Sequence, residues 1–134
     1  MSYRKFNDGD LVFLKDVCGD ERVFGRDAIG EDFCHDELGG VSARPDARVI
    51  VLSIDEISQI MRHANDTGLP VTVRGSGTGL VGGAVPIEGG ILLDTSSMTN
   101  ILELDEENMT LTVEPGVLLM DVAKYVEEIG RAHV

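Results

Sequence analysis

The sequence predicts a single α/β domain, in which a small mixed sheet with a strand–helix–strand crossover is flanked by helices. Three observations lead to this fold class. The 134 residues are 43% hydrophobic but only 4% aromatic, so the core must be built mainly from aliphatic side chains. Short β-branched runs alternate with segments whose apolar residues recur every three or four positions. A glycine-rich stretch, residues 74–83, directly follows one of these runs.

The first 44 residues predict an N-terminal extension of one helix and a loop, ahead of the main domain at residues 45–134. Residues 10–17 form a mixed apolar segment that predicts a helix. Residues 25–45 have irregular polarity and several glycine and proline punctuators, which is typical of a long loop. Within this loop, residues 34–37 (Cys-His-Asp-Glu) have the composition of a metal cluster. Because four adjacent side chains cannot all face one ion, we expect a solvated loop and no metal site.

Residues 48–74 predict a strand, a helix and a second strand. The run 48–52 is β-branched and typical of a buried strand. Ser53 and Glu56 match a capping box, in which the Ser53 hydroxyl satisfies an unpaired amide of the first turn and Glu56 reaches back to the cap residue. The apolar face of this helix carries Ile54, Ile57, Ile60, Met61 and Ala64. The helix ends at a Gly-Leu-Pro sequence, and residues 71–74 form the next strand, which predicts a right-handed crossover with parallel strands.

The remaining elements follow the glycine-rich stretch. Residues 90–94 predict a third strand, and residues 100–104 and 109–114 predict an antiparallel pair around an acidic turn. A final helix is expected to end at Gly130. Its apolar face carries Leu118, Leu119, Val122, Val126 and Ile129.

The charge balance excludes two classes of partner. The formal net charge is −13, from 24 acids and 11 bases, so neither nucleic acid nor an anionic membrane surface would be attracted. The glycine-rich window differs, because residues 68–102 hold one base, Arg74, and two acids, Glu88 and Asp94. We therefore expect an anionic ligand to be tolerated best in this window.

The N-terminal residues lack the apolar core of a signal peptide, and no apolar run approaches membrane-spanning length. These features predict a cytoplasmic protein. Cys18 and Cys34 are then expected to be free thiols in a reducing compartment.

The glycine-rich stretch raises the question of a nucleotide site. Gly77, Gly79 and Gly82 fit G-x-G-x-x-G, the template of a dinucleotide-binding turn. That turn opens a helix, but Pro86 would break a helix here, so a nicotinamide-binding Rossmann module is disfavoured. A Walker A loop fails because no Gly-Lys-Ser/Thr follows the glycines.

A loop of this kind can still bind a pyrophosphate. Consecutive glycines reach backbone conformations that let successive amides point into one concavity for anionic oxygens. The hydroxyls of Ser76 and Thr78 add donors. The purely structural alternative is that these glycines only make tight turns between strands.

Residues 70–86, PVTVRGSGTGLVGGAVP, resemble the pyrophosphate loop of the flavin-binding domain shared by vanillyl-alcohol oxidase-like flavoproteins. Within that group they are most similar to the FAD-linked subunits of glycolate oxidase and D-lactate dehydrogenase. Residues 89–94, 98–102 and 113–117 follow in the family's order and spacing, so the resemblance covers residues 45–130 almost throughout. It implies the first subdomain of a PCMH-type FAD-binding domain, with FAD as the cofactor.

The resemblance also implies a set of cofactor-binding residues. The backbone of residues 75–79 would wrap the FAD pyrophosphate, and Leu80 and Gly82 would continue this cradle. A turn at residues 115–117 would lie against the nucleotide. The residues of the two segments are Gly75, Ser76, Gly77, Thr78 and Gly79, and Pro115, Gly116 and Val117. Arg74 either compensates charge beside the phosphates or forms an ion pair at the strand end, and both remain open. Phe33 stands where such enzymes often carry a tyrosine, so no side-chain hydroxyl is available for a role at this position.

Catalytic residues are not expected in this chain. The family's substrate domain supplies its catalytic histidines, and none of His35, His63 and His133 has the partner pattern of a base. His63 falls on the exposed side of its helix and is expected at the surface.

The resemblance implies the first part of a FAD-dependent 2-hydroxy-acid dehydrogenase or oxidase, inactive as a fragment. In the complete enzyme the flavin would accept a hydride from a small 2-hydroxy-acid substrate. The alternative is a truncated, non-catalytic remnant that self-associates through an exposed apolar face.

Overall fold

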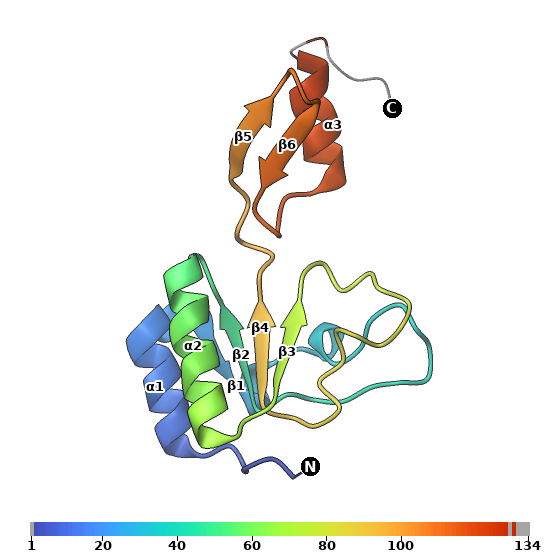
Figure 1. Ribbon diagram of the computed structural model, residues 1–134. Coiled ribbons are helices and arrows are strands. Elements are labelled where there is room, and N and C mark those ends of the chain that lie inside the picture. The colour runs from blue at the N-terminus through green and yellow to red at the C-terminus, as the bar shows by residue number, and fades with distance from the viewer. Residues whose placement is uncertain (1, 129, 131–134) are drawn as a thin grey trace.

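The computed structural model describes residues 2–128 and 130. A four-stranded sheet carries two helices on one face, and a separate hairpin packs beside a third helix (Figure 1). The elements in chain order, with η for short 3-10 turns, are α1 (Asp8–Cys18), η1 (Asp20–Arg22), β1 (Val23–Gly25), η2 (Arg26–Ala28), η3 (Glu31–Phe33), β2 (Ala47–Ile50), α2 (Ile54–Thr67), β3 (Val71–Arg74), β4 (Ile91–Asp94), β5 (Ile101–Asp105), β6 (Thr110–Val113) and α3 (Leu119–Glu128). The predicted α/β class with a small mixed sheet is confirmed.

The larger sheet has the order β1-β2-β4-β3. β1 is antiparallel to β2, while β2 and β3 both pair in parallel with β4. The two strands of the predicted crossover are therefore parallel, but β4 lies between them, with Leu93 opposite both Val49 and Val73. All four residues of β4 are buried, as expected for a central parallel strand covered on both faces.

The core lies between this sheet and the helices α1 and α2. Leu14 of α1 and Ile60 of α2 have no exposed area and pack with Val49 and Leu93 of the sheet. The predicted helix at residues 10–17 is confirmed as α1, which begins with a capping box between Asn7 and Asp10.

The start of α2 differs in detail from the predicted capping box. Ser53 Oγ accepts the Glu56 amide at 3.2 Å, as expected. The predicted return bond to Ser53 is wrong, because Glu56 Oε1 accepts the amide of Leu52 instead, at 2.8 Å. The Glu56 carboxylate also binds Arg22 of η1 through both oxygens, at 2.8 and 2.5 Å. The bonds from Arg22 lower the pKa of Glu56 and tie η1 to α2.

The apolar face of α2 is narrower than the sequence predicts. Ile60 and Ala64 are buried and Ile57 packs against the core, but Ile54 is 79% exposed and Met61 is 43% exposed. The sheet and α1 cover only one stripe of this helix, and the two exposed residues lie at its edges.

The predicted long loop at residues 25–45 contains the end of β1 and two 3-10 turns. The expectation of a solvated loop is wrong at alternate residues: Cys34 and Asp36 are buried, whereas His35 and Glu37 are exposed. The physical reason is that this segment packs on the second face of the sheet, where the Phe33 ring lies against the guanidinium of Arg48.

The hairpin β5-β6 and helix α3 stand apart from the four-stranded sheet (Figure 1). The predicted antiparallel pair and final helix are confirmed, but no described residue of this unit is buried. Val122 and Val126 of α3 are half-buried, whereas Leu118 and Leu119 of the predicted apolar face are exposed. Ile129, the last residue of that face, lies outside the described residues.

Candidate functional site

The glycine-rich stretch leaves the carboxyl end of β3 and returns to the start of β4 as an extended loop. Residues 75–90 are all described and contain turns but no helix. The interpretation that Pro86 forbids a Rossmann helix is therefore confirmed, and Pro86 itself is fully buried. Residues 75–83 of this segment are called the glycine loop below.

The glycine loop presents unused hydrogen-bond donors. Within the described chain, the amides of residues 76–81 donate no hydrogen bond, whereas the amide of Gly82 binds the carboxylate of Asp36 at 2.9 Å. Gly75, Ser76, Thr78 and Gly79 are exposed. A run of free, solvent-facing amides is a backbone arrangement suited to anionic oxygens.

Two kinds of glycine occupy this loop. Gly77 has a φ of +72°, and a Cβ there would lie 2.0 Å from the guanidinium of Arg74, so the protein's own packing requires glycine. At Gly75 and Gly83 the backbone is not left-handed and a Cβ would meet nothing within 4 Å. The fold does not explain these two glycines, which leave open space on the loop's outer side.

Arg74 lies beneath the loop with only 7% of its surface exposed. Its guanidinium donates to the carbonyls of Asp32 and His35, both at 2.7 Å, and lies 5.4 Å from the centre of the Phe33 ring. No ion pair joins it to an acid of the described residues. A buried positive charge without a carboxylate partner therefore lies directly under the free amides.

The acidic residue nearest to Arg74 on β4, Asp94, binds a different arginine. Asp94 is opposite Arg74 in the sheet but accepts Nε and Nη2 of Arg48, at 3.0 and 2.8 Å. The Arg48 guanidinium also lies 3.7 Å from the centre of the Phe33 ring, a cation–π contact. Sequence reasoning missed this cluster, although charged residues in otherwise buried strands are a signal that could have found it.

The predicted residues Pro115, Gly116 and Val117 form a turn beside the end of β4. The Gly116 amide donates to the carbonyl of Met98 at 2.8 Å, and a Cβ there would lie 2.5 Å from the carbonyl oxygen of Thr95. Thr95 in turn donates its amide to the carbonyl of Arg74 at 2.9 Å. The structure thus brings this turn within one residue of the base of the glycine loop.

A family model described as "FAD binding domain" matches residues 45–133. The chain belongs to this FAD-binding domain family. It is 41% identical to a D-lactate dehydrogenase of Anaerostipes hadrus, over 82% of this chain and 23% of that protein. It is 39% identical to glycolate oxidase subunit GlcD of Bacillus subtilis, over 87% of this chain and 25% of that protein. The chain therefore spans about a quarter of the length of these curated relatives, which are oxidoreductases by name.

A solved structure of p-cresol methylhydroxylase with substrate bound has the same fold. The TM-score is 0.80 at 20% identity, over 96% of this chain and 26% of that chain. The predicted resemblance to PCMH-type FAD-binding domains is confirmed, and FAD is the cofactor of this domain family.

The residues of this FAD-binding domain fit such a cofactor. The glycine loop offers free amides and open space where Gly75 lacks a side chain, and Arg74 supplies a positive charge below it. Together these features can hold the negative charge of a pyrophosphate.

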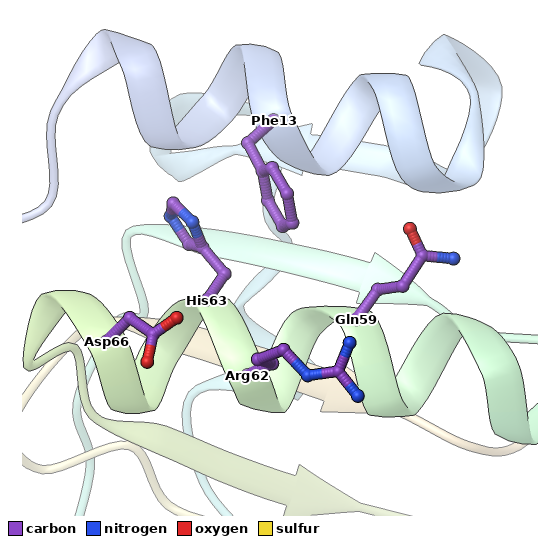
Figure 2. A pocket seen from close by; sticks show the side chains of 5 residues that line it. All are labelled: Phe13, Gln59, Arg62, His63 and Asp66. Carbon is purple, nitrogen blue, oxygen red and sulfur yellow. The ribbon is translucent and has the colours of Figure 1, made fainter.

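A hollow lies between α1 and α2 and is lined by Phe13, Gln59, Arg62, His63 and Asp66 (Figure 2). His63 was expected on an exposed surface, but this is wrong. Its Nε2 lies 2.9 Å from Asp10 Oδ1, and its ring stacks on Phe13 with centroids 4.0 Å apart. His63 therefore joins α2 to α1.

Asp10 is the charged centre of that contact, at 3% exposure. Burial alone would raise its pKa, but hydrogen bonds from Arg4, the Asn7 amide and His63 outweigh burial and lower it. Arg4 binds Asp10 at 2.6 Å and also donates Nε to the carbonyl of Thr67, so the chain before α1 is tied to the end of α2.

Other kinds of site find little support in residues 2–128 and 130. No group of His, Cys, Asp or Glu side chains there could hold a metal ion. Cys18 and Cys34 are free and buried, and burial raises the pKa of Cys18. None of the described helices has the length and apolar character needed to cross a bilayer.

Proposed function

We propose that the glycine loop binds the pyrophosphate of FAD. The amides of Gly75, Ser76, Gly77, Thr78 and Gly79 would donate to the phosphate oxygens, with Leu80 and Gly82 continuing the cradle. The observation that carries this proposal is the run of unpaired amides above a buried arginine that has no acidic partner. Arg74 would act through its charge, since its nitrogens already bind two carbonyls.

The turn formed by Pro115, Gly116 and Val117 would lie against the nucleotide. Support comes from its position beside Thr95, whose amide is bonded to the base of the glycine loop. Main-domain residues 45–134 would form the first part of the flavin domain, with residues 1–44 as its N-terminal extension.

For the complete protein we propose a FAD-dependent dehydrogenase or oxidase that acts on the CH–OH group of a small 2-hydroxy acid in the cytoplasm. Support comes from the names of its relatives, a D-lactate dehydrogenase and a glycolate oxidase subunit. Bound flavin would supply the hydride acceptor. The residues of this chain would bind and orient the cofactor, and none of them would act on the substrate.

The test compares FAD binding by the chain and by two glycine variants. Gly75→Ala places a methyl group on the open side of the loop without touching the protein. Gly25→Ala is the matched control, because its Cβ also meets nothing within 4 Å but lies on β1, away from the loop. We expect Gly75→Ala to weaken FAD binding about tenfold, the equivalent of about 1.4 kcal/mol, and Gly25→Ala to leave it unchanged.

The measurement is FAD fluorescence during titration, supported by the visible spectrum after desalting. Thermal unfolding of both variants should match the parent chain, which separates a binding defect from a folding defect. FAD binding by Gly75→Ala with the parent affinity would rule out the assignment of the loop.

A second candidate function is a non-catalytic flavin-domain protein that self-associates. The observation that favours it is the exposed apolar surface of the hairpin unit, where Met109 is 83%, Leu119 82% and Met120 80% exposed. Such a surface favours association. Light scattering tests this candidate, since a monodisperse monomer at high concentration would count against it.

A further inference from the structure

The segment at residues 32–38 lies against the glycine loop and is joined to it at several points. The Glu37 amide donates to the carbonyl of Gly79 at 2.9 Å. The Gly82 amide donates to Asp36 Oδ2, also at 2.9 Å. Arg74, the residue directly before the loop, donates to two carbonyls of the same segment. The residue before the glycine loop and two residues within it are thus bonded to residues far away in the sequence.

Among the described residues, Asp36 supplies the one side-chain hydrogen bond from this segment to the glycine loop. It is 6% exposed, and its other oxygen, Oδ1, accepts the amide of Leu38 at 2.9 Å. No salt bridge involves Asp36 within the described residues. The carboxylate therefore serves two backbone amides, one of its own segment and one of the loop.

The chemistry of this position requires two acceptors and no donor. Aspartate provides an acceptor on each oxygen, whereas asparagine has a single acceptor oxygen and would turn its NH₂ group toward one of the two amides. A negative charge beside an anion-binding loop opposes ligand binding by itself. Its presence there is explained by the shape it gives the loop.

We propose that Asp36 is a positioning residue for the glycine loop. It takes the Gly82 amide out of the donor set and fixes the far end of the loop, which keeps the amides of residues 76–81 together as the anion-binding face. The importance of this for cofactor binding rests on the function proposed above. The positioning itself is a property of the ligand-free chain.

The experiment measures amide hydrogen exchange by NMR in the ligand-free chain and FAD affinity by fluorescence. The variants are Asp36→Ala and the nearly isosteric Asp36→Asn. The matched control is Glu37→Gln. It removes a negative charge from the adjacent, exposed side chain and keeps the backbone hydrogen bond to Gly79. Exchange at Leu92, in the central strand, reports whether the fold is intact.

We expect the Gly82 amide to exchange about tenfold faster or more in Asp36→Ala, as for the loss of a bond to a charged acceptor. In Asp36→Asn, with a single acceptor oxygen, we expect the Gly82 amide, the Leu38 amide or both to exchange faster. Leu92 protection should be unchanged, and FAD affinity should fall by at least about threefold despite the removal of a negative charge. Glu37→Gln should leave Gly82 exchange unchanged and should not weaken FAD binding.

The proposal would be overturned by unchanged Gly82 exchange in Asp36→Ala, or by unchanged exchange of both Gly82 and Leu38 in Asp36→Asn. Faster Gly82 exchange with FAD affinity equal to or above that of Glu37→Gln would also overturn it. If Asp36→Ala also loses protection at Leu92, its fold is disturbed, and the exchange and FAD affinity of Asp36→Asn then test the proposal. If the parent chain binds no FAD, the proposed function fails in this chain, while Gly82 exchange still decides whether Asp36 positions the loop.

Discussion

Replacement of Gly77 by alanine tests how the glycine loop is held from below. The new Cβ would lie 2.0 Å from Nη2 and 2.4 Å from Cζ of Arg74, at a backbone φ of +72°. A left-handed alanine costs about 1–2 kcal/mol. Moving the guanidinium aside breaks at least one of its bonds to the carbonyls of Asp32 and His35, at about 1.5–3 kcal/mol. We therefore expect a loss of about 2.5–5 kcal/mol in the free energy of unfolding.

The assay is thermal and urea unfolding followed by circular dichroism. For 134 residues, an unfolding entropy of about 2.1 cal/mol/K per residue converts this loss into a Tm lower by about 9–18 °C. Gly75→Ala is the matched control, because no atom lies within 4 Å of its Cβ and its φ is not left-handed. Its stability should stay within about 0.5 kcal/mol of the parent chain. Equal stabilities for the two variants would refute the reasoning that Gly77 is required by the packing of Arg74.

Two further predictions concern acid stability and the thiols. The pKa values of Asp10 and Glu56 lie below their ordinary 3.8 and 4.5, so their stabilisation is complete above those values and is lost as pH falls through the lower, folded pKa values. Urea unfolding between about pH 5 and pH 3 should show falling stability, with a shallower fall in Asp10→Asn, and an unaltered slope in that variant would contradict this origin. Cys18 and Cys34 are free and buried, so both should react slowly with Ellman's reagent in the folded chain and completely in denaturant. Immediate labelling of either thiol in the folded chain would contradict its buried position.

Regular elements were predictable wherever their signal is local. The helix α2 follows from a serine cap and a final glycine, and β3 and β4 follow from short apolar runs. The insertion of β4 between β2 and β3 was not predictable, because strand order depends on which edges meet in space. β1 was missed for the same reason, since three residues carry no pattern until they pair with β2.

The glycine loop was predictable from the sequence, but the contacts that hold it in place were not. Glycine spacing and a following proline exclude a Rossmann helix from the sequence alone. The bond from Gly82 to Asp36 joins residues separated by 46 positions, and neither residue type indicates it. The sequence leaves two roles open for Arg74. Its carbonyl partners in the structure cannot be inferred from charge patterns, because every residue carries a carbonyl.

The position of β4 has a consequence for the order in which this domain can fold. β2 and β3 both find their parallel partner in a strand that is synthesised after them. Until residues 91–94 arrive, β3 has no strand to pair with, and the chain between residues 75 and 90 is an open segment without a fixed end. Pairing of β3 with β4 closes this segment, and the entropy lost on closure is offset by the burial of the central strand. Completion of the sheet and formation of the glycine loop are therefore one event, so a nascent chain has no loop to offer a nucleotide before its central strand is in place.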